Sequence, residues 1–126
     1  MNARVTKKER ALIKGALRRV FSRSELRRRV LNAYAIEHQD TNRPRVSAWV
    51  WCAACGVVFP RYLAVVDHID PLVPLHRVSE DMEPNELVDR LWCEENNLQA
   101  LDKSCHKIKT RSESKARREF KKRNLK

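Results

Sequence analysis

A C-x-x-C pair followed by glycine is the feature of this sequence that most restricts its fold. The short spacing lets the thiolates of Cys52 and Cys55 converge on one point, and Gly56 permits the tight turn that this requires. Cys105 stands at the start of an expected helix, whose dipole favours its thiolate. We therefore expect these three cysteines to bind a structural zinc ion; the alternative is that they are buried as small apolar side chains.

Charge is distributed unevenly along the chain. Residues 1–30 contain 11 Lys or Arg and 2 acidic residues, and residues 103–126 have the same numbers, whereas residues 31–102 contain 5 basic and 12 acidic residues. Basic ends favour a polyanion as partner, because lysine and arginine that neutralise phosphates release counterions. Nucleic acid is the expected partner; the alternatives are a solvated surface or an RNA contact of the ribosomal kind.

The length suits one domain, residues 1–126, with a modest core. No apolar run approaches the roughly 20 residues of a membrane span, and no signal-peptide stretch follows the first residues. We expect a soluble, cytoplasmic protein without membrane contact, in which the cysteines are reduced.

Hydrophobic spacing predicts a fold of the α+β class. Two basic amphipathic helices are expected in residues 10–24 and 22–38, forming a helical hairpin within residues 1–40. Ser22 and Glu25 have capping-box spacing for the second helix. Strands are expected at 46–51 and 64–69, a short helix at 85–93, and a final helix that begins at Asp102 and continues into a basic tail, residues 116–126. The apolar face of the first helix would comprise Leu12, Ile13, Ala16, Leu17, Val20 and Phe21.

Four segments in order carry a resemblance to a known family. They are CAAC (52–55), VDHIDP (66–71), NNLQAL (96–101) and CHKIKT (105–110). Together they resemble the HNH endonucleases over about residues 50–115, in particular the small enzymes of tailed bacteriophages. The resemblance implies a ββα-metal (His-Me finger) core within residues 46–115, with a zinc knuckle and one catalytic divalent cation. The first strand would be 64–69, the second would begin with 98–101, and the helix would carry His106.

The resemblance also implies roles for four side chains. His68 would be the general base, Asp67 and His106 would bind Mg²⁺ or Mn²⁺, and Asn97 would orient His68 or its backbone. These residue types suit phosphodiester hydrolysis, which needs an activated water and positive charge near the phosphate. Taken singly, each has an ordinary structural explanation as a turn, strand-end or helix-start residue.

The sequence departs from the family pattern at one position. Relatives with a zinc knuckle have C-x-x-C-H at the helix start, but here Asp102 replaces the first cysteine. Asp102 lies on the same helical side as Cys105 and can be an oxygen ligand of zinc or an N-cap. Cys93 is the alternative fourth ligand. Lys107 and Lys109 are expected to be solvated, with phosphate contact as the alternative.

The expected function is that of a metal-dependent HNH endonuclease that hydrolyses DNA phosphodiester bonds. Its partners would be DNA and, in phage DNA processing or packaging, a terminase; its location would then be the host cytoplasm. The alternative is a zinc-stabilised nucleic-acid-binding protein without catalysis, which would keep the basic ends and the knuckle and not need Asp67, His68 and His106.

Overall fold

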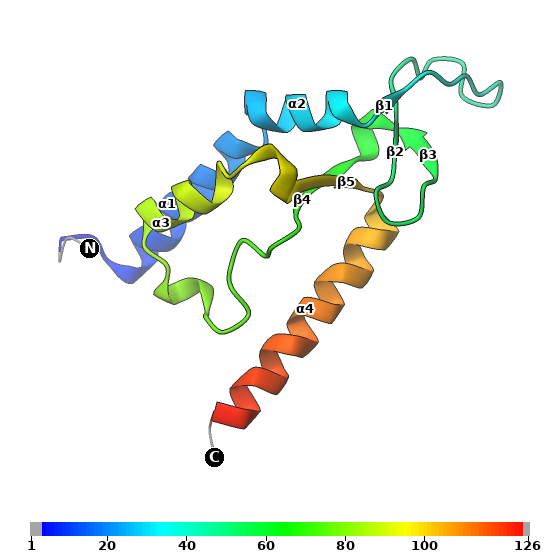
Figure 1. The fold of residues 1–126 in the computed structure, drawn as a ribbon. Coiled ribbons are helices and arrows are strands. Elements are labelled where there is room, and N and C mark those ends of the chain that lie inside the picture. The colour runs from blue at the N-terminus through cyan, green and yellow to red at the C-terminus, as the bar shows by residue number, and fades with distance from the viewer. Residues whose placement is uncertain (1–3, 125–126) are drawn as a thin grey trace.

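A computed structural model describes residues 4–124, which form mixed helix and antiparallel sheet, the expected α+β class (Figure 1). The helices are α1 (Lys7–Phe21), α2 (Glu25–Ala33), α3 (Pro84–Leu91) and α4 (Lys103–Asn124). The strands are β1 (Ala35–Ile36), β2 (Trp49–Trp51), β3 (Val58–Pro60), β4 (Val65–His68) and β5 (Leu98–Leu101), and short 3-10 turns cover Arg61–Leu63, Ser79–Asp81 and Glu95–Asn97.

The strands form two small sheets. β2 lies between β1 and β3, and β4 pairs with β5; all pairings are antiparallel. The register of the second sheet places Asp67 opposite Gln99 and His68 opposite Leu98. Since successive strand residues face opposite sides, Asp67 and Gln99 share one face of β4–β5. α2 packs on β4 and β5, and α4 packs on β4.

Two apolar clusters join these elements. One packs α1, α2, α3 and β5 around Phe21, Leu26, Val30, Met82, Leu87, Leu91 and Leu98. The other packs α2 and both sheets around Leu31, Val50, Cys52, Phe59, Ala64, Ala100 and Leu101. Because Cys52 is fully buried in the second cluster, the cysteine pair begins inside the core and ends at the surface.

The expected apolar face of α1 is correct for Leu17 and Phe21, which pack in the first cluster, and wrong for its other large apolar members. Leu12 and Val20 are 63% and 59% exposed, whereas Lys14 is buried. α1 packs against α3 with the stripe Arg10, Lys14, Leu17 and Phe21. Basic side chains can occupy this stripe because their long stems are apolar and their charged heads find partners: Lys14 Nζ donates to the Met82 carbonyl, and Arg10 lies 3.7 Å from a Glu83 carboxylate oxygen.

Several element boundaries also differ from expectation. The N-cap of α2 is Ser24, whose hydroxyl accepts from the Arg27 N–H, whereas the Ser22 hydroxyl donates to the Arg19 carbonyl at the end of α1. Ser22 cannot start α2 because α1 continues to Phe21. A capping box that the sequence analysis missed starts α1, with Thr6 and Glu9 bonded reciprocally.

The end of α2 and the first sheet were also incompletely predicted. α2 ends at Ala33 because the chain then pairs with β2 as strand β1. Neither β1 nor β3 was predicted as a strand of its own. The two N-terminal helices pack mainly on different partners, α1 on α3 and α2 on β4 and β5, so each is held by the body of the protein.

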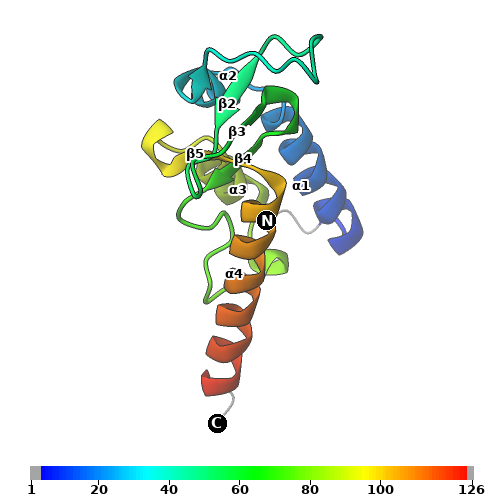
Figure 2. The same ribbon diagram turned by 90° about the vertical axis from the view of Figure 1, so that its right-hand side faces the viewer.

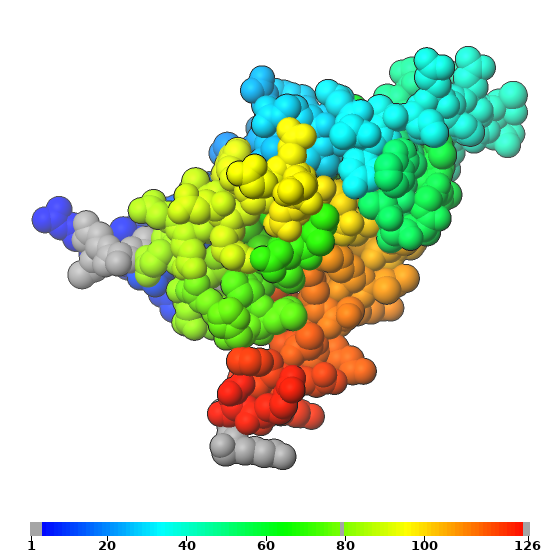
Figure 3. Space-filling model, in the orientation of Figure 1, coloured from blue at the N-terminus to red at the C-terminus, as the bar shows by residue number. Residues whose placement is uncertain are grey.

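α4 projects from the rest of the molecule as a long arm (Figures 1 and 2). It continues through the expected tail to Asn124. The space-filling view shows its last turns at the lower end of the molecule, while the segment near residues 40–48 projects at another corner (Figure 3). The rings of Phe120 and His76 still lie near each other, with centroids 6.3 Å apart. Among the helices of residues 4–124, none combines the length and apolarity needed to cross a bilayer.

The buried stripe between α1 and α3 predicts very different effects for two chemically identical substitutions. Leu87→Ala should lower the free energy of unfolding by about 2–5 kcal/mol, because Leu87 is fully buried and leaves a cavity. Leu12→Ala should change it by no more than about 0.5 kcal/mol, because most of Leu12 is exposed. Urea denaturation of both variants measures the difference; equal losses would contradict this packing of α1.

Candidate functional site

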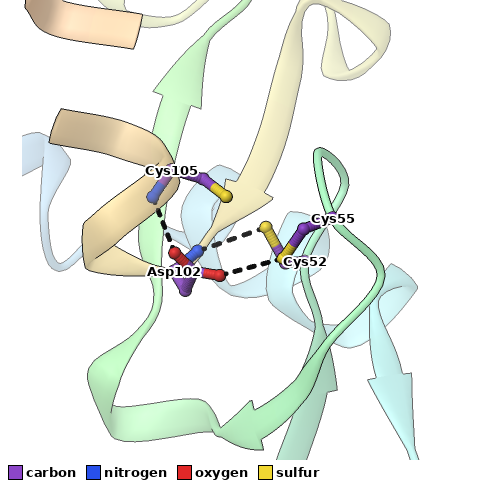
Figure 4. A group of neighbouring side chains, drawn as sticks. All are labelled: Cys52, Cys55, Asp102 and Cys105. Atoms are coloured by element: carbon purple, nitrogen blue, oxygen red, sulfur yellow. Dashed lines mark hydrogen bonds between the residues drawn. The ribbon is translucent and has the colours of Figure 1, made fainter. Parts of the chain in front are cut away.

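Cys52, Cys55, Asp102 and Cys105 form one compact group. Their ligand atoms all lie within 4.8 Å of one another (Figure 4). Cys52 and Cys55 lie in the turn between β2 and β3, and the other two residues lie where β5 passes into α4. Gly56 adopts a positive φ of 77°, as the tight turn requires, and the Ala53 N–H donates to the Ala100 carbonyl, which fixes the turn against β5.

Asp102 caps α4 and also lies where it could ligate a metal ion, the two functions that the sequence left open. Its Oδ1 accepts from the Cys105 N–H at 2.7 Å, the N-cap interaction of α4. Its Oδ2 lies 3.2 Å from Cys55 Sγ, and its N–H donates to Cys52 Sγ at 3.5 Å. One carboxylate oxygen therefore caps the helix while the other faces the thiols.

The protonation of the group depends on its crowding. Burial raises the pKa of Cys52, but N–H donors from Asp102, Cys55 and Ala54 outweigh it, and the net pKa is below its usual value. The neighbouring Cys55 thiol, followed by burial, raises the pKa of Cys105 to about 12. Several thiolates and a carboxylate cannot be charged together here without a cation. A divalent metal ion would provide that positive charge, because thiols that coordinate a metal are deprotonated.

The donor set fits a thiophilic metal ion. Three sulfur atoms and one carboxylate oxygen are consistent with structural zinc, whose bonds of about 2.3 Å to sulfur place tetrahedral sulfur ligands about 3.8 Å apart. Cys93 does not belong to the group: it packs against the α1–α3 cluster, and the Asn97 side-chain amide donates to its sulfur at 3.7 Å. Asp102 is thus the fourth member, and the alternative fourth ligand Cys93 is not supported by the geometry.

A second group of chemically active residues surrounds a cavity of about 230 Å³ between β4, α4 and the segment after β4. Asp67, His68 and His106 all line it, together with Glu113 and Arg117. The structure therefore brings together the three residues that the sequence analysis selected for a nuclease centre, although His106 lies 38 positions after His68.

Asp67 is the anionic centre of this cavity. Its side chain is 9% exposed and divides its two oxygens between partners. Oδ1 lies 3.8 Å from His106 Nε2, while Oδ2 accepts from Lys109 Nζ and from the Gln99 amide, each at 3.0 Å. The first pair can share a Mg²⁺ or Mn²⁺ ion, because two ligands with bonds of about 2.1 Å can be as much as about 4.2 Å apart.

His68 is held in a defined orientation. Its Nε2 lies 3.1 Å from the Leu91 carbonyl, and its ring packs against Phe21 with centroids 5.4 Å apart. A carbonyl can only accept, so Nε2 carries the proton and Nδ1 is the basic nitrogen.

Asn97 fixes the chain that follows His68. Its carbonyl accepts from the Ile69 N–H at 2.8 Å, and its side-chain Oδ1 accepts from the Asp70 N–H at 2.9 Å. Its side chain forms no hydrogen bond to the imidazole itself. Asn97 therefore orients the backbone beside His68, the second of the two possibilities that the resemblance implied.

Three residues in or beside the cavity were not selected from the sequence: Glu113 and Arg117 line it, and Lys109 contacts Asp67 next to it. Lys109 was expected to be solvated, but its Nζ donates to Asp67, to Glu113 at 2.6 Å and to the His68 carbonyl at 2.9 Å. Burial lowers the pKa of Lys109, but Glu113 and Asp67 outweigh it and the net pKa is raised. Arg117 donates to the Val73 carbonyl while its Nε has no partner. The available signal was helical spacing, because Lys109, Glu113 and Arg117 follow one another at intervals of four.

Comparison with known proteins supplies no relative. No protein-family model matches this sequence, and no curated protein or solved structure is significantly similar to it. What can be stated of this chain is an α+β fold with a Cys₃Asp group that can hold a metal ion. The residues around the Asp67 cavity carry the functional argument.

The Cys₃Asp group predicts that protein purified without added metal contains about one divalent ion per chain, which we expect to be zinc. Asp102→Asn separates the two functions of Asp102, because asparagine caps a helix as well as aspartate but is not an anion. The variant should bind zinc at least about tenfold more weakly while keeping its helix content. Competition with a chromophoric chelator measures the affinity, and circular dichroism measures the helix.

Cys93→Ser provides the matched control, since Cys93 lies outside the group. It should retain the ion with unchanged affinity. Metal-free wild-type protein would rule out the metal site. Equal zinc affinity in Asp102→Asn and wild type would rule out Asp102 as a ligand.

Proposed function

We propose that this protein is a metal-dependent endonuclease of the HNH type that hydrolyses DNA phosphodiester bonds. The observation that carries the proposal is the convergence of Asp67, His68 and His106 on one cavity. A carboxylate–imidazole pair suited to one cation and a neighbouring neutral imidazole are the groups that this hydrolysis needs. Their order along the chain is that of the family which the sequence resembles.

The arrangement of elements supports the same proposal. β4 and β5 are antiparallel, and α4 follows β5 after a single residue, Asp102. Asp67 and His68 end the first strand, Asn97 directly precedes the second strand, and His106 lies in the first turn of the helix. We therefore assign β4, β5 and α4 to a ββα-metal core and the β2–β3 turn to its zinc knuckle.

His68 acts as the general base in this proposal. The Leu91 carbonyl holds the proton on Nε2, which leaves Nδ1 to take the proton of the attacking water. The ring of His68 packs against Phe21, and Asn97 accepts hydrogen bonds from the backbone that follows His68. Together these contacts restrict movement of the imidazole. Such fixation matters because catalysis is sensitive to displacements of about 1 Å.

Asp67 Oδ1 and His106 Nε2 would hold the catalytic cation, with water and substrate phosphate as its other ligands. When bound, Mg²⁺ or Mn²⁺ would stabilise the negative charge that develops on the phosphate and the leaving oxygen. Arg117 supports this assignment because its guanidinium lines the same cavity and provides positive charge for a phosphate there.

The Cys₃Asp group would position the start of α4 and the His106 imidazole. Cys105 is the residue before His106, so an ion held there fixes the first turn of α4 and with it the imidazole. We assign this ion as zinc with a structural function, because four protein ligands leave no open position. The phage setting and the terminase partner remain predictions from the resemblance.

One observation favours the alternative, a zinc-stabilised DNA-binding protein without catalysis. Lys109 and Gln99 already satisfy Asp67 Oδ2, so the buried carboxylate has a charge partner without a metal ion. In that case Asp67, Lys109 and Glu113 would form a structural ion-pair network between β4 and α4. Cleavage is the property that distinguishes the two functions.

Cleavage of supercoiled plasmid tests the proposal. We expect cutting with Mg²⁺ or Mn²⁺ and none in EDTA, and we expect His68→Ala to lower the rate by about 10²- to 10⁴-fold, the usual contribution of a general base. Gel electrophoresis measures the rate, and nicked or linear product reports whether one or both strands are cut.

His38→Ala is the control variant, since His38 packs on Trp49 away from the cavity. It should cleave like wild type. DNA binding without cleavage in any of these ions, by wild-type protein that contains its structural metal, would sink the proposal and leave the binding protein.

A further inference from the structure

A second cavity, which unlike the Asp67 cavity is basic, lies at the other end of β4. Its volume is about 490 Å³, and it is bounded by α2, by the segment 45–48 and by the turn Arg61–Leu63. Arg27, Arg45, Arg61 and Tyr62 line it, and its described lining contains no acidic residue. It shares no lining residue with the Asp67 cavity. Figures 1 and 2 show α2, this loop and the first sheet together at one end of the molecule.

Two of the arginines are anchored without losing their charge. Arg27 Nη2 donates to the Ala64 carbonyl at 3.3 Å, and Arg61 Nη1 donates to Asn32 Oδ1 at 2.7 Å. Both side chains are half-buried, and within residues 4–124 neither they nor Arg45 form an ion pair. Each bond occupies one of five donors, so the remaining N–H groups can serve a ligand.

The guanidinium groups also repel one another. Burial lowers the pKa of Arg27, and the charge of Arg61 lowers it further. Like charges held together at a half-buried position create a positive potential that an anion relieves. The fork of N–H groups on arginine matches the oxygens of a phosphate, which makes phosphate the anion of choice.

We propose that this cavity binds a phosphate of the DNA backbone, at a distance from the bond that is cut. The inference rests on the proposed function for its partner, DNA. Tyr62 strengthens it, because a tyrosine that is 72% exposed beside three arginines offers a ring and a hydroxyl to the sugar of the same nucleotide. Ala64, which anchors Arg27, lies four residues before His68, or roughly 13 Å along a strand. That length corresponds to about four steps of 3.4 Å along a DNA strand.

The salt dependence of DNA binding tests the site. The full chain, with its bound metal and without added divalent ions, is titrated into a fluorescein-labelled duplex at a series of KCl concentrations, and anisotropy gives the affinity. Arg45→Gln/Arg61→Gln should weaken binding several-fold at low salt. It should also reduce the slope of log affinity against log salt concentration by about 0.9, the value for one lost phosphate contact.

Arg28→Gln/Arg43→Gln is the matched control. It removes the same charge from exposed positions next to Arg27 and in the same loop as Arg45, but neither residue lines the cavity. The control should keep the wild-type slope. An equal loss of DNA affinity and slope in both double variants would overturn the proposal, because a diffuse positive surface would explain it. No loss in either variant would also overturn it, because the cavity would then make no contact with DNA.

The single variant Arg45→Gln guards against misfolding, since the Arg45 side chain is exposed and forms no hydrogen bond or ion pair within residues 4–124. It should show part of the loss of the double variant, and a wild-type affinity would contradict the site. These measurements need no cleavage. A protein that binds through this cavity but never cuts DNA would refute the proposed nuclease and leave the phosphate site standing.

Discussion

The junction between β5 and α4 is the point on which the candidate functions depend. Asp102 caps the helix with one oxygen and faces the cysteine pair with the other, so the start of α4 is joined to the β2–β3 turn. The bond from Ala53 to the Ala100 carbonyl holds the same turn against β5. Because His106 lies in that first turn of α4, these interactions help to place its imidazole. A displaced helix start would separate His106 from Asp67 even with every cavity residue intact.

Electrostatic compensation explains why an acidic centre tolerates two basic ends. Asp67 is nearly buried in the acidic middle of the chain, and Lys109 from the basic end neutralises it together with Glu113. At the opposite end of β4, arginines from α2, the segment 45–48 and the turn Arg61–Leu63 gather without acids in the described lining. The sequence pattern of charge therefore becomes a spatial one, with a compensated cavity and an uncompensated cavity at the two ends of a single strand.

Local signals predicted the parts of the structure whose chemistry is local. The cysteine pair, the strand that ends in Asp67 and His68, and the helix start at Asp102 were all identified in sequence, because spacing and turn residues determine them. The packing face of α1 was identified only in part. Apolar content alone ignores the apolar stems of Arg10 and Lys14 and their partners just before α3, Glu83 and the Met82 carbonyl. β3 was missed for the same reason: its three residues form a strand only because β2 is available to pair. Lys109 was misjudged because its partner Asp67 is distant in sequence.

Asp67 and Asp102 divide their two carboxylate oxygens between partners in the same way. Each aspartate gives one oxygen to a fixed donor, Lys109 and Gln99 in one case and the Cys105 N–H in the other, and turns the second oxygen toward metal-ligating side chains. The fixed bond removes the rotational freedom of the carboxylate, so an arriving cation meets a ligand already in position. It also means that Lys109 does not have to leave Asp67 for His106 and Oδ1 to share an ion. The ion pair that favours a structural explanation of Asp67 is therefore compatible with the catalytic one, and the two differ only in whether Oδ1 binds a metal.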